Sequence, residues 1–125
     1  MIALFDSSVL IAHLRGVDAA TALLSHHARE GTALGSVLSR TELEGGMRSA
    51  ERAPVARLFE AVRLVPVSDA IAARAGAHLR RYRRSHAAID IVDHVIAATA
   101  EELNAELLTL NVRHFPMLRG LRPAF

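Results

Sequence analysis

The 125-residue chain contains no cysteine, which excludes disulfide bridges, a thiol nucleophile and thiolate ligands for a metal ion. Lysine is also absent, so all 15 residues counted as Lys or Arg are arginine. The isoelectric point of about 10.3 therefore accompanies a net charge of only +2, because almost no group loses its charge before arginine does. The positions of the arginines consequently say more about binding than the isoelectric point does.

Long apolar runs are missing as well. No stretch approaches the roughly 20 residues that cross a bilayer, and the first residues, MIALFDSSVL, lack the basic start of a secretory signal. We therefore expect a cytoplasmic protein without membrane contact, and we expect residues 1–125 to form a single domain. Only one tyrosine, four phenylalanines and no tryptophan occur, so stacking on nucleic-acid bases is expected to be a minor theme.

Short apolar runs alternate with longer helix-like segments, which is the pattern of an α/β fold with a mainly parallel sheet. We predict a three-layer α/β/α domain with a four- or five-stranded sheet. Strands are expected at 2–5, 33–38, 64–67 and 107–110, with the tail 121–125 as a candidate edge strand. Helices are expected at 9–14, 18–29, 39–46, 55–62, 70–84 and 91–103. The last helix is apolar nearly all round and should be central and buried.

Four acidic residues lie where predicted strands and helices meet. Asp6 follows the first strand, and Glu42 lies in the first turn of the helix after the second strand. Asp90 and Asp93 lie at the start of the buried helix. In open parallel sheets the ligand crevice forms at the carboxyl ends of the strands, so these acids are expected to converge there.

Each acid also has a purely structural explanation. Asp6 could form an Asx turn, and the segment from Ser39 to Glu42 matches a capping box. Asp90 could cap its helix, and Asp93 could interact with the helix dipole. However, an unpaired carboxylate at the start of an apolar helix is costly, and several together repel one another. A divalent cation would remove that repulsion, and oxygen ligands without cysteine favour Mg²⁺ or Mn²⁺ over zinc.

Four segments resemble the signature blocks of the PIN-domain family, in the family's order and spacing over nearly the whole chain. They are FDSSVLIAHL (5–14), SRTELEGG (39–46), DIVDHVIAATA (90–100) and LLTLNVRHF (107–115). The third and fourth segments carry most of the specificity, whereas the second alone would be a weak signal. The short length and the first segment resemble the VapC toxins within this family.

The resemblance implies a metal site. In the family the first-block Asp, the second-block Glu and the Asp that opens the third block bind metal, and they correspond here to Asp6, Glu42 and Asp93. Asp90 is a further candidate ligand. The last block often holds a fourth acid, but this sequence has Asn111 and His114 there. Asn111 is therefore a candidate catalytic residue, because its amide could hold a metal-bound water.

The activity implied by the resemblance is that of an Mg²⁺-dependent endoribonuclease toxin, with Mn²⁺ as the alternative metal. The ion would activate water for in-line attack on an RNA phosphodiester, leaving a 5′-phosphate and a 3′-hydroxyl. The implied partners are RNA, a VapB-like antitoxin and a second copy of the chain in a homodimer. Two alternatives remain: a catalytically weakened PIN module that binds RNA or a partner, which the missing fourth acid favours, and a housekeeping PIN nuclease of RNA processing.

Arginines are densest just before the third block, where they are candidates for contacts with RNA phosphates. They are Arg80, Arg81, Arg83 and Arg84. The alternative is a solvated face of an amphipathic helix. The seven histidines contain no helical metal-binding pair, which argues against a zinc enzyme. We expect His26 and His27 at the surface and His94 as a polar residue at a helix start.

The helices between residues 9 and 62 carry more apolar side chains than one core is expected to bury, and leftover apolar patches mark interaction sites. These side chains include Leu10, Leu14, Leu23, Leu24, Leu58 and Phe59. We expect an antitoxin segment to lie along an apolar groove among these helices, with a basic side chain reaching the carboxylates.

Overall fold

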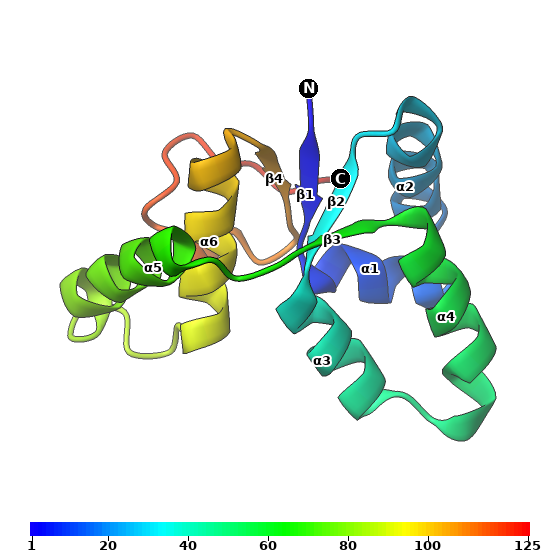
Figure 1. Ribbon diagram of the computed structural model, residues 1–125, viewed down its shortest axis with the longest axis horizontal. Coiled ribbons are helices and arrows are strands. Elements are labelled where there is room, and N and C mark those ends of the chain that lie inside the picture. The colour runs from blue at the N-terminus through cyan, green and yellow to red at the C-terminus, as the bar shows by residue number, and fades with distance from the viewer.

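A four-stranded parallel sheet forms the centre of the computed structural model, which describes residues 1–125 (Figure 1). The strands are β1 (Ala3–Phe5), β2 (Ala33–Ser36), β3 (Arg63–Val65) and β4 (Glu106–Leu108), in the order β3-β2-β1-β4. Every neighbouring pair is parallel. The expected α/β class with a parallel sheet is confirmed.

Six α-helices cover the two faces of the sheet (Figure 1). On one face lie α1 (Ser7–Leu14), α2 (Asp18–Glu30), α3 (Val37–Gly46) and α4 (Arg52–Ala61). On the other lie α6 (Ile91–Leu103), which packs on the strands, and α5 (Asp69–Tyr82), which packs against α6. Two short 3-10 turns complete the structure, η1 (Ser49–Glu51) and η2 (Val112–His114).

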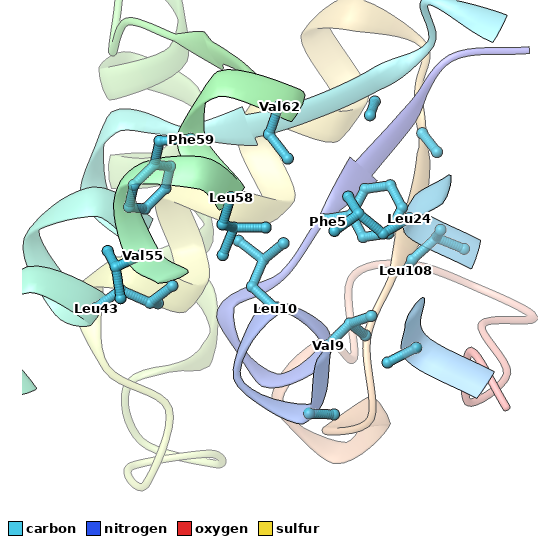
Figure 2. Close-up of a cluster of buried hydrophobic side chains, with 14 residues drawn as sticks. Phe5, Val9, Leu10, Leu24, Leu43, Val55, Leu58, Phe59, Val62 and Leu108 are labelled. Carbon is cyan, nitrogen blue, oxygen red and sulfur yellow. The ribbon is translucent and has the colours of Figure 1, made fainter. Parts of the chain in front are cut away.

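Successive side chains of β1 enter different layers of the core, because neighbouring side chains on a strand point to opposite faces. Ala3 and Phe5 belong to a cluster of 14 buried residues shared with α1 to α4, whereas Leu4 packs against α6. The larger members of the first cluster are drawn in Figure 2: Phe5, Val9, Leu10, Leu24, Leu43, Val55, Leu58, Phe59, Val62 and Leu108. Both faces of the central strand are therefore covered.

The apolar helix 91–103 has the predicted bounds and the predicted central position. All residues from His94 to Ala100 are buried, and Ile96, Ala97 and Ala100 pack on the sheet. The opposite side of α6 meets Ile71 and Ala75 of α5. Two layers thus hold α6 rigidly, with its first turn at the carboxyl edge of the sheet.

Several expectations need correction. The third helix begins at Val37 rather than at 39, because Ser36 is its N-cap and accepts a hydrogen bond from the Leu38 amide at 3.1 Å. The tail 121–125 forms no strand and makes one backbone bond to the sheet edge, from Ala124 N to Thr109 O at 2.9 Å. No helix of this structure has the length and apolar character needed to cross a membrane.

The apolar residues that were expected to overflow the core are mostly inside it. Leu10, Leu24, Leu58 and Phe59 are all buried in the cluster of Figure 2. Leu14 and Leu23 are half-buried at the margin of the same cluster. Any surface for a partner on this side must therefore be formed by half-buried side chains in grooves rather than by a large exposed apolar patch.

Candidate active site

The candidate site lies where the order of the strands reverses. The chain builds β1, β2 and β3 outward in one direction and then returns to place β4 on the other side of β1. Ligands of open α/β sheets bind at this point, outside the carboxyl ends of the strands. Asp6 follows β1 and Thr109 follows β4, and the Asp6 amide donates to Leu108 O at 2.9 Å.

Asp6 is held by two hydroxyl groups. It is 5% exposed, and its Oδ2 accepts hydrogen bonds from Ser8 Oγ and Thr109 Oγ1, both at 2.8 Å. Asp6 occupies the N-cap position of α1, but its side chain accepts no bond from a backbone amide of that helix. The Asp6 carboxylate is therefore fixed in direction and is not used as a helix cap.

Glu42 is linked to the first block through Ser7. The Ser7 hydroxyl lies 2.7 Å from Glu42 Oε1 and 3.0 Å from the buried Ser39 hydroxyl. The capping-box interpretation of Ser39 and Glu42 is wrong, because Ser39 lies inside α3 and Ser36 caps it. Glu42 instead extends from the exposed side of α3 toward the start of α1, as the placement of the acids at one sheet edge predicts.

Asp93 lies in the first turn of α6 with 17% of its side chain exposed. Burial, and after it the charges of Asp90 and Asp6, raise the pKa of its carboxyl to about 6. His114 opposes this rise, with its Nδ1 3.2 Å from Asp93 Oδ2. The charge of Asp6 contributes to this pKa, which indicates that the carboxylates of Asp6 and Asp93 lie near one another although they are far apart in the sequence.

Asp90 has the structural role that the sequence allowed. It is the N-cap of α6, and its Oδ1 accepts a hydrogen bond from the Asp93 amide at 3.1 Å. This bond leaves Oδ2 of the exposed Asp90 side chain without a hydrogen bond in the chain. A role for Asp90 as a metal ligand stays a prediction beside this observed cap.

The last block touches both ends of the acid cluster. The Asn111 amide N–H donates to Thr109 Oγ1 at 3.0 Å, and Thr109 in turn donates to Asp6. The following turn, η2, brings His114 to Asp93. Where a fourth acid is expected in this family, the chain thus has an amide that bonds through its backbone and an imidazole that pairs with a carboxylate.

The donor set suits a hard divalent cation, because carboxylates and hydroxyls supply oxygen and no thiolate is present. Burial, and after it the charges of Asp90 and Asp6, raise the pKa of Asp93, as expected where carboxylates lie near one another without a counter-ion. In the side-chain arrangement of the structure, however, no group of three or more His, Asp or Glu residues is positioned to hold one ion. The ligand assignment to Asp6, Glu42, Asp93 and Asp90 therefore stays a prediction.

The arginine run lies at the end of α5 and in the turn that follows it. All four side chains are exposed, and none takes part in an ion pair: Arg80, Arg81, Arg83 and Arg84. The loop after α5 leads directly into the first turn of α6, which carries Asp93 (Figure 1). The position of this run relative to the acid cluster, and its contact with RNA, stay predictions.

Sequence reasoning placed the histidines less well. His94 is fully buried, and neither of its ring nitrogens has a hydrogen-bond partner, whereas a polar residue at the helix start was expected. His26 is exposed as predicted, but His27 is half-buried and its Nδ1 lies 2.8 Å from Thr32 Oγ1. Burial lowers the pKa of both His94 and His27, so burial favours their neutral forms.

The comparisons with known proteins agree with this arrangement. A PIN domain family model matches residues 3–119 of the chain. The chain is 52% identical to Ribonuclease VapC10 of Mycobacterium tuberculosis over 122 residues, which cover 98% of this chain and 92% of that protein. It is 45% identical to Ribonuclease VapC19 of the same species over 98% of both chains.

A solved structure shares the fold at much lower identity. The structure described as DNA-bound VapBC from Salmonella typhimurium superposes with a TM-score of 0.81 at 18% identity, covering 98% of this chain and 96% of that one. The chain belongs to the PIN-domain family, and its VapC relatives place it in the VapC branch of that family. The resemblance drawn from the four sequence blocks is confirmed.

Proposed function

We propose that this chain is a metal-dependent endoribonuclease, the toxin half of a VapBC-type pair, which hydrolyses RNA phosphodiester bonds in the cytoplasm. The observation that carries the proposal is the placement of Asp6, Glu42 and Asp93 on three segments at the carboxyl edge of the sheet, with Glu42 linked to the start of α1 by Ser7. Two curated relatives that match almost the full chain are named ribonucleases. The aligned length includes every residue of the site.

The residues that would hold the metal are Asp6, Glu42 and Asp93, with Asp90 as a further candidate. Mg²⁺ fits this all-oxygen set, and Mn²⁺ is the alternative. When bound, such an ion supplies a Lewis acid that activates water and stabilises charge on the phosphate. The ion would also remove the repulsion that now raises the pKa of Asp93.

The chain's own residues would prepare the site for that chemistry. Ser8 and Thr109 direct the Asp6 carboxylate, and Ser7 directs Glu42. Such fixed positions matter because a displacement of about 1 Å at a catalytic group can cost about a hundredfold in rate. The exposed arginine run would bind the RNA phosphates beside the site and hold the strand across it.

A VapB-like antitoxin is the partner that this proposal requires. A groove of about 440 Å³ lies among α1, α3 and α4, and its lining combines apolar Ile11, Leu14 and Met47 with Glu42. An antitoxin segment in this groove would cover one of the proposed ligands, and a basic side chain could pair with the carboxylate. Occupation of the groove would therefore block the site directly. We further propose that the chain acts as a homodimer.

One alternative is a weakened PIN module that acts by binding RNA or a partner. The observation in its favour is that Asn111 and His114 replace the fourth acid of the family, which leaves fewer negative ligands for a second ion. His114 also pairs with Asp93 in the structure. Under this alternative the chain would bind RNA with measurable affinity and would not shorten it.

The test is cleavage of defined RNA by the purified chain, followed on denaturing gels. The proposal predicts fragments with 5′-phosphate and 3′-hydroxyl ends in Mg²⁺ or Mn²⁺, none in a chelator, and none when the product of the neighbouring gene is added. Expression without that product should stop growth. If the chain binds the RNA but the RNA stays intact in both metals, the proposed ribonuclease activity is wrong and the alternative of a binding module is favoured.

A further inference from the structure

The only tyrosine of the chain stands inside the arginine run. Tyr82 is the last residue of α5 and lies between Arg81 and Arg83. Its ring is half-buried and belongs to none of the three clusters of buried apolar side chains. None of these three clusters therefore accounts for a tyrosine at this position.

The rest of α5 shows how the chain treats its other basic groups on this helix. Arg74 pairs with Glu102 of α6 at 2.9 Å, and the His78 imidazole pairs with Glu101 of the same helix. The four arginines around Tyr82 have no such acidic partner, although they lie on the same helix or just beyond it. Their positive charge is thus left to meet an anion from outside the chain.

Tyr82 is also held by its neighbours. The His86 ring stands nearly perpendicular to the Tyr82 ring, at 81° with centroids 5.4 Å apart. The Arg81 guanidinium carbon lies 5.4 Å from the Tyr82 ring centroid. The turn is closed by a bond from the His86 amide to Tyr82 O at 2.7 Å, and Ser85 Oγ lies 2.8 Å from His86 Nδ1.

We propose that Tyr82, braced by His86 and Arg81, is a stacking platform for one base of the single-stranded RNA that the enzyme cleaves. Aromatic rings beside unpaired guanidinium groups are the combination by which proteins bind single strands, since every base has a flat π-face and every nucleotide has a phosphate. The inference rests on the proposed function for its ligand, and it adds a base-binding position beside the acid cluster.

A loop connects the proposed base-binding position at Tyr82 to the helix that carries Asp93. The loop after Tyr82 runs into α6, and the helix opens with Asp90 and Asp93 at the carboxyl edge of the sheet (Figure 1). The proposal requires a strand anchored on Tyr82, with its phosphates on the arginines, to continue from the end of α5 to these acids. The platform would help to choose which nucleotide stands beside the bond that is cut.

Because the chain has one tyrosine and no tryptophan, its intrinsic fluorescence reports on Tyr82 alone. The experiment titrates the full chain in a chelator with a short oligouridylate, with inorganic polyphosphate of equal charge, and with an acidic peptide. We expect saturable quenching by the oligouridylate and none by polyphosphate, which has no bases. Equal quenching by polyphosphate, or quenching by the peptide and not by the RNA, would overturn the platform.

Variants supply the second measurement, by anisotropy of a labelled oligouridylate. Tyr82→Phe keeps a ring and should bind as wild type, whereas Tyr82→Leu should lose about five- to a hundredfold in affinity, the range found for base–aromatic stacking. Phe125→Leu removes an exposed aromatic ring elsewhere and is the matched control. Circular dichroism shows that each variant folds. Wild-type affinity in a folded Tyr82→Leu variant would overturn the proposal.

The two proposals fail in different ways. Metal-dependent RNA cleavage without any change in Tyr82 emission would keep the ribonuclease and remove the platform. Saturable quenching that RNA bases cause, without cleavage in any metal, would keep the platform and remove the enzyme. RNA binding is measured in a chelator, so the quenching of Tyr82 emission does not depend on metal-dependent cleavage.

Discussion

At the scale of single residues, the Thr109 hydroxyl links the first sequence block, which contains Asp6, to the last block, which contains Asn111. It is fully buried, donates to Asp6 Oδ2 at 2.8 Å and accepts from the Asn111 amide at 3.0 Å. A hydrogen bond to a charged group stabilises a protein by about 1.5–3 kcal/mol, and the loss of a partner leaves the other group unsatisfied. Thr109 should therefore position Asp6 without touching the substrate.

The corresponding prediction compares Thr109→Val with Thr109→Ser. The valine variant should lose roughly 1–3 kcal/mol in free energy of unfolding, because both hydrogen bonds disappear, and should bind Mg²⁺ more weakly. The serine variant keeps the hydroxyl and should stay close to wild type in both respects. Urea unfolding and metal titration measure the two effects. A valine variant with unchanged metal affinity would show that Thr109 is packing alone.

Asp93 makes the stability of the metal-free protein depend on pH. Its pKa is about 6 in the folded chain, mainly because of burial and then of Asp90, against an ordinary value of 3.8. The folded state thus keeps this proton to higher pH than the unfolded state, so its stabilising effect is full below about pH 4 and is lost as pH rises through about 6.

The prediction is that the free energy of unfolding in a chelator falls between pH 4 and pH 7, with at most about 3 kcal/mol from this group, since one pKa unit is about 1.4 kcal/mol. Asp93→Asn should remove that part of the slope and be more stable than wild type at pH 7. Denaturant titrations across pH measure it. Parallel curves for the two proteins would contradict the assigned pKa.

The residues of the site differ in how far sequence could predict them. Asp6, Glu42 and Asp93 were predicted as metal ligands from their positions near expected strand ends and helix starts and from the resemblance of the four blocks to a family, and this role stays a prediction. The partners of Ser7 and Thr109 could not be predicted, since a hydroxyl is common in turns and these partners lie 35 and 103 residues away in the sequence. The burial of His94 had no signal in the sequence, because polar residues are also common at helix starts.

At the scale of elements, α5 carries two kinds of basic side chain: some form ion pairs within the chain, and others have no acidic partner. Its earlier basic groups pair with the C-terminal end of α6, and its own end presents arginines without an acidic partner. Each phosphate contact to a single strand contributes about 0.7 to the slope of log affinity against log salt. The arginine run should therefore set most of the salt dependence of RNA binding.

The prediction concerns a variant with Ser at the arginine run, measured by RNA binding at several salt concentrations in a chelator. The substituted positions are Arg80, Arg81, Arg83 and Arg84. Affinity should fall at low salt, and the slope should flatten by up to about 3 if all four contact phosphates. Arg74→Ser, which breaks an internal ion pair, is the control and should leave the slope unchanged. An unaltered slope in the fourfold variant would exclude this face from RNA binding.

Element type was more predictable than element ends. The bounds of the helix 91–103 were predicted to the residue from its apolar segment, and Asp90 and Asn104 occupy its two cap positions in the structure. The start of α3 was misplaced because Ser36 and Ser39 are both acceptable caps in sequence, and only the end of β2 decides between them. The tail 121–125 was expected as a candidate edge strand, but it makes only one backbone hydrogen bond to the sheet edge, from Ala124 N to Thr109 O.

At the scale of the whole molecule, the surface of the chain suggests an assembled state. Beside the groove that contains Glu42, a second groove of about 420 Å³ lies among α1, α2 and α4, lined by Leu14, Pro54 and Ala61 among others. Leu14 lines both grooves and is only half-buried. A helical segment with apolar residues at helical spacing could occupy them together.

We predict that the purified chain is a dimer at micromolar concentration and that it forms a stable, inactive complex with the product of the neighbouring gene. Leu14→Arg should weaken that complex, because it places charge in both grooves, while leaving RNA cleavage intact. Light scattering and cleavage assays measure these results. A monomer in light scattering would contradict the proposed dimer. A product of the neighbouring gene that neither binds the chain nor blocks RNA cleavage would contradict the proposed toxin–antitoxin pair.

The central claim is that the acids at the sheet edge, and no others, carry metal-dependent RNA hydrolysis. The most direct measurement is the cleavage rate of one RNA by Glu42→Gln and Glu44→Gln in Mg²⁺, beside Asp93→Asn. Both glutamates lie on α3, but Glu42 meets Ser7 whereas Glu44 pairs with Arg40 on the surface. The account predicts that Glu42→Gln and Asp93→Asn lose at least about a hundredfold in rate, as for removal of a group that stabilises charge in a transition state, and that Glu44→Gln keeps the wild-type rate. Wild-type cleavage by a folded Glu42→Gln or Asp93→Asn variant would contradict it.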